Sequence, residues 1–330
     1  MKIGIIGAGA MGSLLGFYLS EHADVWLLDG WQAHIDAINA GGLRRELDGV
    51  EEVCHPRATG DPGAIGPCDA VLVLVKAHQT AWAAEQARTL LRTEGRGLRI
   101  ESKDSVLSPR ASALGTLVVT LQNGIGNREI LAARLGEERV GQGVTALGAT
   151  LLEPGHVLHA GQGATVFGTD PDGAGAAALA ALFRSCGLPA ELSDDLDALV
   201  WGKLVVNTGI NALTALLRVP NGALAVVPQA RALVEQAVAE AAVVAAARGV
   251  RLPDSDTLAH VLIVAQATGA NRSSMLQDVL RGSPTEIATI NGAVVREGAR
   301  LGVPTPVNAL LVALVSALDA TADMRVRDSP

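Results

Sequence analysis

Three polar residues recur at intervals of four in an otherwise apolar segment: Lys203, Asn207 and Asn211. On a helix, steps of four residues place side chains along one slowly drifting stripe. A helix that is apolar on its other faces is expected to be buried. Because a buried ammonium or carboxamide without a partner is costly, something polar should face this stripe. A ligand cleft is the simplest partner.

A glycine-rich loop near the N-terminus is the second feature that could do chemistry. The apolar run 2–6 predicts a buried strand, and the spacing of 13–19 predicts a helix. A Gly-x-Gly-x-x-Gly between them, with an acidic residue after the next strand, is typical of a dinucleotide site. We expect the first glycine to permit a tight turn, the second to admit a pyrophosphate and the third to let helix and strand pack closely. The helix N-terminus would attract the phosphates. The predicted cofactor residues are Gly7, Ala8, Gly9, Ala10, Met11, Gly12 and Asp29. The alternative is a tight turn that binds no ligand.

Asp29 ends the second predicted strand, 23–29, where it could accept hydrogen bonds from an adenosine ribose. A 2′-phosphate would instead meet a carboxylate, so Asp29 favours NAD(H) over NADP(H). The alternative is a solvated aspartate at a strand end.

Lys76 and Asn123 each follow a further predicted strand, 69–75 and 116–122. In a doubly wound sheet, the carboxyl ends of strands border the cofactor crevice, so both residues could touch the nicotinamide or the substrate. The alternatives are a surface lysine and a plain Asn-Gly turn.

Two polar clusters in the C-terminal half open predicted helices, 272–281 and 284–301. The first contains Asn271 and Ser274, and the second contains Ser283 and Glu286. A structural alternative exists for each. Ser283, Pro284 and Glu286 match a capping box, and Ser274 could be an ordinary first-turn serine.

The remaining pattern predicts an α/β Rossmann-type domain over 1–192, followed by an all-helical domain over 193–330. Short strands between 140 and 169 should extend the sheet, with turns at 154–155, 161–163 and 170–173, a helix over 174–186 and a strand near 189–192. The helix that carries the stripe should be capped by Asp194 or Asp195 and end before the break at 220–222, and further helices are predicted over about 227–248, 254–268 and 305–321. Segment 92–115 reads as a long charged loop or small hairpin without an assigned function, and the tail from Asp323 should fray.

Composition narrows the class of protein. The chain has 330 residues, a net charge of −8 and only 2% aromatic residues, which argues against a nucleic-acid surface. Three scattered cysteines without a CxxC suggest a reducing compartment and no structural metal. We expect no signal peptide and no membrane span, and hence a cytoplasmic protein.

Together these motifs resemble the ketopantoate reductase family. The resemblance rests on the glycine loop, Val-Lys76-Ala-x-Gln, Gln-Asn123-Gly, the Lys203/Asn207/Asn211/Asn221 series, Asn271-x-Ser-Ser274-Met-x-Gln-Asp and Thr-Glu286-Ile-x-x-Ile-Asn-Gly. Members reduce 2-dehydropantoate to (R)-pantoate, a step towards pantothenate and coenzyme A, and usually use NADPH. The chain departs from the family in its longer 92–115 segment and in lacking a basic residue after Asp29-Gly30. The resemblance therefore implies NADP(H), whereas the second departure leaves NAD(H) open and Asp29 favours it.

The resemblance also implies roles for the polar residues. Lys203 would protonate the alkoxide, and Glu286 would hydrogen-bond the substrate or hold Lys203. The implied substrate-binding residues are Asn207, Asn211, Asn221, Asn271 and Ser274. Lys76 and Asn123 would act from the cofactor domain. Two other functions remain open: a reductase of another branched 2-oxo acid, and a non-catalytic dinucleotide sensor. Assembly as a homodimer is also open.

Overall fold

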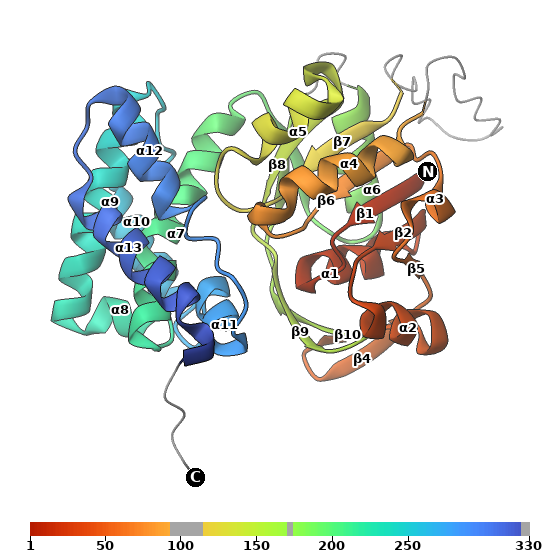
Figure 1. The fold of residues 1–330 in the computed structure, drawn as a ribbon, viewed down its shortest axis with the longest axis horizontal. Coiled ribbons are helices and arrows are strands. Elements are labelled where there is room, and N and C mark those ends of the chain that lie inside the picture. The colour runs from red at the N-terminus through yellow and green to blue at the C-terminus, as the bar shows by residue number, and fades with distance from the viewer. Residues whose placement is uncertain (93–114, 170–173, 325–330) are drawn as a thin grey trace, which may run out of the picture. The chain divides into compact units, whose positions relative to one another are not determined.

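The computed structural model describes residues 1–92, 115–169 and 174–324. The chain forms two compact units, Met1–Gln122 with Asn127–Leu196, and Asn123–Gly126 with Asp197–Pro330 (Figure 1). The loop or hairpin predicted within 92–115 lies almost wholly outside the described residues, as do the turn predicted at 170–173 and the end of the tail.

An eight-stranded sheet forms the centre of the first unit, in the order β12-β11-β8-β7-β6-β1-β2-β5. The strands are β1 (Lys2–Ile6), β2 (Asp24–Leu28), β5 (Arg57–Thr59), β6 (Ala70–Val73), β7 (Leu117–Thr120), β8 (Val140–Thr145), β11 (Thr165–Gly168) and β12 (Ala190–Ser193). Six neighbouring strands of the sheet, β8-β7-β6-β1-β2-β5, are mutually parallel. Strand β11 runs antiparallel to β8. The strand order reverses between β1 and β6, which is where open α/β sheets bind ligands.

Helices cover both faces of this sheet (Figure 1). On one face the core includes residues of α1 (Ala10–Leu19), α2 (Gln32–Gly41) and α6 (Ala174–Ser185). On the other it includes residues of α3 (Pro62–Ile65), α4 (Thr80–Leu90) and α5 (Asn127–Leu135). Short 3-10 turns, η1 (Ala77–Gln79) and η2 (Glu137–Arg139), complete the unit. Neighbouring residues of β1 serve opposite faces: Ile5 packs in the first cluster and Ile6 in the second. Such two-sided burial explains why the strand is a continuous apolar run.

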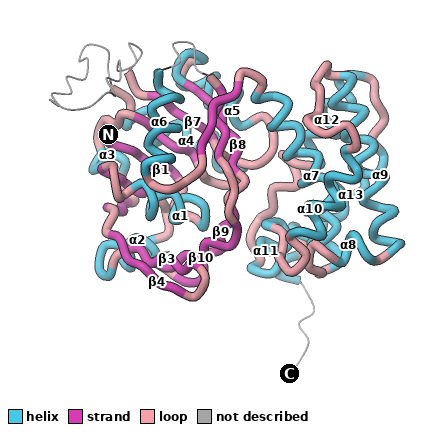
Figure 2. Tube along the Cα trace, turned by 180° about the vertical axis from the view of Figure 1, so that it is seen from behind, coloured by secondary structure: helices cyan, strands magenta, loops and turns pink. Residues whose placement is uncertain are grey.

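A second sheet, of order β4-β3-β10-β9, was not expected from the sequence. Its strands are β3 (Leu43–Leu47), β4 (Val50–Cys54), β9 (Gly148–Glu153) and β10 (His156–Gly161), which lie side by side in Figure 2. The prediction that the strands within 140–169 all extend the main sheet is therefore wrong for β9 and β10. Strands β9 and β10 form a hairpin, in which Val157 is paired with Leu151. Both side chains pack in the core on the α1 side of the unit. This apolar packing, rather than the main sheet, holds the hairpin.

The described part of the second unit is all-helical, as predicted. Its helices are α7 (Leu196–Leu217), α8 (Ala223–Val226), α9 (Pro228–Ala247), α10 (Thr257–Ala267), α11 (Ser274–Arg281), α12 (Asn291–Leu301) and α13 (Pro306–Ala320), followed by the turn η3 (Ala322–Met324). Helix α9 packs against α8, α10, α12 and α13. The predicted division at residue 192 falls just before α7. In the structure the first unit ends at Leu196 and the second continues from Asp197.

The helix predicted over 284–301 is wrong in its first part, because α12 begins only at Asn291 and residues 286–290 form a bend followed by a turn. The backbone N–H and hydroxyl of Thr285 both donate to the Asp319 carboxylate on α13, at 3.1 and 2.7 Å. This tertiary tie holds the segment in a path that the local capping signal did not reveal.

Helix α7 is the one described helix that is long and apolar enough to cross a membrane by length and composition. Its most apolar window is 67% buried inside the unit, as in the core helix of a folded domain.

Candidate active site

The three glycines of the N-terminal loop differ in what surrounds them. Gly7 has φ +99°, and a Cβ there would lie 2.6 Å from the backbone nitrogen of Val75. A Cβ on Gly12 would lie 1.9 Å from the Gly7 carbonyl oxygen. Both positions therefore require glycine for the fold itself. Gly9 is exposed, and no described atom lies within 4 Å of the place its Cβ would occupy. Protein packing does not demand glycine at this position, whereas a cofactor phosphate passing close to the backbone would.

The loop opens directly onto a helix N-terminus. Gly9 is the N-cap of α1 and provides no side-chain cap, so the first-turn N–H groups are available to an anion. The Gly7 contact with Val75 also shows that the loop after β6, which carries Lys76, lies beside the glycine loop. Lys76 itself is half-buried and is the N-cap of η1. The structure thus brings together the segments that carry Lys76 and the glycine loop.

Asp29 follows β2, as predicted, and its carboxylate is anchored at the same loop. One oxygen accepts from the Ala8 N–H at 2.7 Å, and the other accepts from the Trp31 N–H at 2.9 Å. The half-buried carboxylate is therefore held beside the glycine loop. A ribose hydroxyl could donate to it, whereas a phosphate would be repelled.

Ser13 and His34 support this loop and were not identified from the sequence. The Ser13 hydroxyl donates to the Ala8 carbonyl at 2.7 Å and lies 3.0 Å from His34 Nε2. Because the Gly155 N–H donates to His34 Nδ1, the imidazole proton belongs on Nε2 and points to Ser13. Burial lowers the pKa of His34, the larger effect, while Asp29 raises it. No local pattern could reveal this chain of contacts, since Gly155 lies in a distant hairpin.

Lys203 and Glu286 come together in the second unit from distant parts of the sequence. Lys203 is on α7, and the buried Glu286 lies in the turn before α12. Burial lowers the pKa of Lys203 to about 8, while the charge of Glu286 raises it. The capping-box interpretation of Glu286 is wrong, since no helix begins at Pro284. The pair can supply a proton near neutral pH.

The rest of the predicted stripe continues along α7. Asn207 is half-buried and Asn211 is 5% exposed. Thr214 extends the stripe, and its hydroxyl lies 2.7 Å from the Ser273 hydroxyl. Ser273 in turn accepts from the Leu276 N–H and is the N-cap of α11. The sequence had not singled out Thr214 or Ser273, although Thr214 lies one turn beyond Asn211.

The region around the start of α11 contains three of the predicted substrate-binding residues, Ser274, Asn271 and Asn221. Since Ser273 caps this helix, Ser274 is its first residue and is half-buried. The Asn221 N–H donates to the Asn271 carbonyl at 3.0 Å, and the Asn221 amide donates to the Thr268 hydroxyl at 3.0 Å. Asn221 Oδ1 is buried without a hydrogen-bond partner among the described residues. Asn221 therefore positions the Asn271 segment and leaves one buried acceptor unused, whereas the Asn271 residue is exposed.

Asn123 belongs with the helical unit, not with the cofactor domain where the sequence placed it. The Ile125 N–H donates to the Thr289 carbonyl at 3.3 Å. Gly124 has φ +82°, and a Cβ there would lie 2.2 Å from the Thr289 oxygen. The Asn-Gly pair is thus more than an ordinary turn, because Gly124 lets the chain pack against the turn that carries Glu286.

A buried amide ties this turn to α7. Asn291 donates to the Thr208 carbonyl of α7 at 3.2 Å and to Asn308 Oδ1 of α13 at 3.0 Å. Asn308 in turn donates to Glu240 of α9 at 2.8 Å. Asn291 belongs to the Ile-Asn-Gly part of the resemblance, but its structural role was not predicted.

The first unit combines a doubly wound sheet, a glycine loop at its switch point and an open helix N-terminus, and the second holds a Lys–Glu pair. This combination defines an oxidoreductase that uses a nicotinamide dinucleotide. The family model described as ketopantoate reductase PanE/ApbA matches residues 3–172, and the model for the C-terminal part of the same family matches residues 195–319. The chain belongs to the ketopantoate reductase family.

Two curated relatives cover nearly the whole chain. The 2-dehydropantoate 2-reductase of Halobacterium salinarum is 36% identical over 319 residues, which are 96% of this chain and 98% of that protein. The 2-dehydropantoate 2-reductase of Pyrococcus horikoshii is 33% identical over 322 residues, 97% of this chain and 98% of that protein.

Solved structures share the whole fold. A PanE/ApbA family ketopantoate reductase from Ralstonia eutropha has a TM-score of 0.84 at 34% identity, covering 98% of this chain and 100% of that one. D-Mandelate dehydrogenase with NADH and anilino(oxo)acetate has a TM-score of 0.86 at 30% identity, with the same coverage.

Proposed function

We propose that the protein reduces 2-dehydropantoate to (R)-pantoate with a reduced nicotinamide dinucleotide, and that Lys203 is the proton donor. The observation that carries the mechanism is the Lys203–Glu286 pair, in which the pKa of Lys203 is lowered to about 8. Most Lys203 side chains are then protonated at neutral pH, and the proton is easier to release than from an ordinary lysine. Curated relatives named 2-dehydropantoate 2-reductase support the choice of substrate.

A nicotinamide dinucleotide held by the glycine loop would supply a hydride for the C2 carbonyl carbon of the 2-oxo acid. Lys203 donates a hydrogen bond to the carbonyl oxygen and transfers its proton as negative charge develops there. General acid catalysis of this kind contributes about 10²–10⁴-fold. Lys203 is left as a neutral amine and regains a proton from solvent. Glu286 favours the charged form of Lys203 and thereby prepares it for the next turnover.

The polar residues around the two helices would hold the substrate. We assign the substrate hydroxyl to Asn207, Asn211 and Asn221, of which Asn221 has an unused buried acceptor. Ser274 and Asn271 would bind the carboxylate, since Ser274 is the first residue of α11 and a helix N-terminus attracts anions. Lys76 and Asn123 would contact the nicotinamide or the substrate.

We assign the cofactor to the glycine loop from Gly7 to Gly12 and propose a preference for NAD(H) over NADP(H). The open space at Gly9 and the free helix N-terminus fit a pyrophosphate. The Asp29 carboxylate held at Ala8 favours an unphosphorylated ribose. A 30%-identical relative has been solved with NADH, whereas the family resemblance alone implies NADP(H).

A second candidate function is the reduction of another 2-oxo acid. D-Mandelate dehydrogenase has the same fold, and its structure holds NADH and anilino(oxo)acetate. The residues assigned above would polarise the carbonyl of either substrate. The two candidate functions are therefore distinguished by testing 2-oxo acids that differ in their side chain.

Steady-state kinetics with 2-dehydropantoate, branched aliphatic 2-oxo acids and phenylglyoxylate, each with NADH and NADPH, test these proposals. We expect the highest kcat/KM with 2-dehydropantoate and NADH. A tenfold higher kcat/KM with another 2-oxo acid would replace the proposed substrate. Cofactor binding without turnover of any substrate would instead indicate a dinucleotide sensor.

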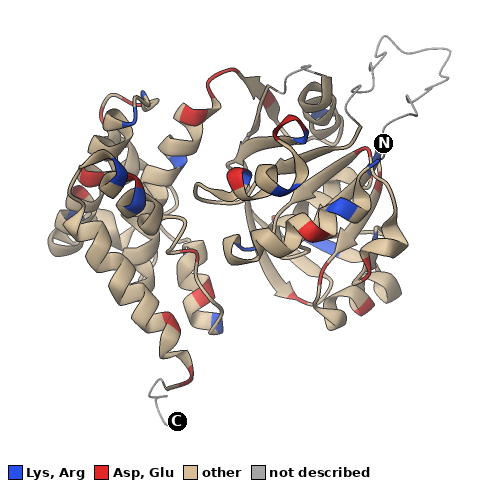
Figure 3. Ribbon diagram, turned by 45° about the horizontal axis from the view of Figure 1, so that its top comes forward, with Lys and Arg blue, Asp and Glu red and all other residues tan. Residues whose placement is uncertain are grey.

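We propose a cytoplasmic setting, because the three cysteines are free thiols, which suits a reducing compartment. Acidic and basic residues are interspersed over each unit in the described part of the chain (Figure 3). The small 2-oxo acid is the proposed binding partner. Size-exclusion chromatography would show whether the chain forms a homodimer.

A further inference from the structure

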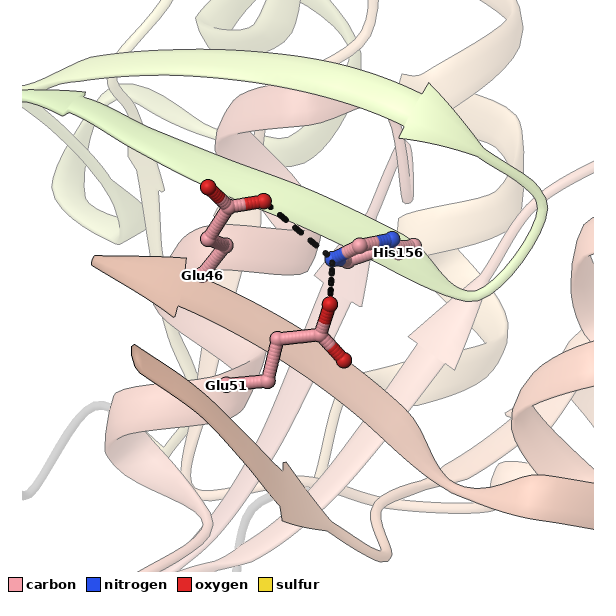
Figure 4. A group of neighbouring side chains, drawn as sticks. All are labelled: Glu46, Glu51 and His156. Carbon is pink, nitrogen blue, oxygen red and sulfur yellow. Dashed lines mark ion pairs between the residues drawn. The ribbon is translucent and has the colours of Figure 1, made fainter. Parts of the chain in front are cut away.

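The small sheet of the first unit brings together Glu46, Glu51 and His156 from three different strands (Figure 4). Glu46 on β3 faces Glu51 on β4 in the antiparallel register. On the other side of β3, Arg44 is the partner of His156 on β10. Because side chains two residues apart share a face of a strand, all these residues project from the same face. None of them is assigned to the cofactor or the substrate.

His156 is the unusual member of the group, since it is only 7% exposed. Its Nε2 is buried without a hydrogen-bond partner among the described residues. The nearest carboxylate oxygens, of Glu46 and Glu51, both lie 3.9 Å away, beyond hydrogen-bond distance. A buried ring nitrogen left in this state is costly, so the arrangement calls for a further partner.

The other ring nitrogen indicates which kind of partner. His156 Nδ1 faces the Glu153 carboxylate at 3.7 Å. The same Glu153 oxygen accepts from Arg44. Metal binding would require the imidazole proton on Nδ1, on the Glu153 side, and would leave the Nε2 lone pair directed at Glu46 and Glu51. Histidines that bind metals commonly have such a carboxylate at their second nitrogen.

We propose that His156 Nε2, with one oxygen each of Glu46 and Glu51, binds a divalent transition-metal cation of the Zn²⁺ or Mn²⁺ class. The three ligand atoms all lie within 4.8 Å of one another. Ligands of a tetrahedral Zn²⁺ lie about 3.3 Å apart, so the carboxylates must approach by roughly half an ångström or more. The Glu46 and Glu51 side chains are 32% and 52% exposed and can rotate to do so. Water would fill the remaining positions.

The cation would cross-link β3, β4 and β10, and so hold the second sheet together. It would also neutralise two carboxylates, of which Glu51 lies 3.9 Å from both Arg44 and His156. This site departs from the expectation of no structural metal, which rested on the cysteines, because its donors are imidazole and carboxylate. The rival explanation is a protonated His156 that forms ion pairs with the glutamates and needs no metal.

Cobalt binding to the full-length protein without a histidine tag, after dialysis against a chelator, tests the proposal. We expect one Co²⁺ per chain with visible d–d absorption, displaced by Zn²⁺, and a rise in Tm with added Zn²⁺. His156→Gln should weaken binding at least tenfold, and Glu51→Gln should weaken it too. Glu51→Gln changes a half-exposed side chain and keeps the test valid if the histidine variant does not fold.

His22→Gln is the matched control, because His22 is an exposed histidine paired with one carboxylate, Glu21, in the same unit. It should bind Co²⁺ like the native protein. The absence of stoichiometric binding in the native protein, or full binding in either His156→Gln or Glu51→Gln, would overturn the site and favour the ion-pair explanation.

Discussion

The Glu286 carboxylate acts on the Lys203 ammonium from a turn that only the tertiary structure brings to α7. Burial is the larger influence and lowers the pKa of Lys203 to about 8, while Glu286 opposes it. An isolated buried lysine would be neutral too readily, and an exposed lysine would hold its proton too firmly. The balance between burial and one carboxylate gives a proton donor suited to neutral pH.

Removal of the Lys203 side chain should abolish the proton transfer without affecting the other unit. We expect Lys203→Ala to lower kcat at least 100-fold, within the range of general acid catalysis. The Kd for NADH, measured by fluorescence titration, should stay within threefold of the native value. A near-normal kcat in this variant would show that another group donates the proton.

The pH profile should report the same residue. Lys203 is active in its protonated form, so kcat/KM for reduction should fall as the pH rises through about 8. In Glu286→Gln the opposing charge is lost, and the descending limb should move to lower pH. Glu297→Gln is the control, because Glu297 pairs with Arg248 and Arg300 on the surface. A limb that stays in place in Glu286→Gln would separate Glu286 from the titration of Lys203.

Alanine substitutions in the glycine loop should separate cofactor binding from folding. Gly9→Ala places its Cβ in open space, so the free energy of unfolding should change by less than about 1 kcal/mol while cofactor Kd rises at least tenfold. Gly12→Ala would meet the Gly7 carbonyl and should destabilise the fold. Chemical denaturation and cofactor titration measure the two effects. Unchanged cofactor affinity in Gly9→Ala would favour a tight turn without a ligand.

The charge of Asp29 should control the choice of cofactor. Asp29→Asn keeps an oxygen for the Ala8 N–H but removes the negative charge. We expect the ratio of kcat/KM with NADH to kcat/KM with NADPH to fall at least tenfold. Asp36→Asn, on the exposed side of α2, should leave the ratio unchanged. A native enzyme that already prefers NADPH would contradict the role proposed for Asp29.

Gly124 should matter for catalysis through its contact with Thr289. Gly124→Ala and Gly126→Ala both place alanine at a positive φ, +82° and +100°, which costs about 1 kcal/mol or more. Only at Gly124 would the Cβ also meet the Thr289 carbonyl. Gly124→Ala should therefore lower the free energy of unfolding more than Gly126→Ala does. It should also lower kcat at least tenfold, because the turn that carries Glu286 is displaced. Equal effects in the two variants would show that backbone strain alone matters.

The sequence predicted the elements whose residues lie close together along the chain. The glycine loop between β1 and α1, the position of Asp29 after β2 and the helix that carries Lys203 and Asn211 were all located from local spacing. The helix start predicted at Pro284 was wrong, because the Thr285–Asp319 contact overrode the local capping signal. The β9–β10 hairpin was assigned to the wrong sheet, because alternation predicts strands but not their partners.

The sequence alone determined a dinucleotide loop and a polar stripe on a buried helix, since each depends on residue types at fixed local intervals. The tertiary structure decided which distant groups act on them. It placed Glu286 near Lys203, moved Asn123 to the helical unit, and set His34 behind the glycine loop. The same applies to Glu46, Glu51 and His156. Contacts of this kind depend on chain packing between segments far apart in sequence, and local spacing carries no information about them.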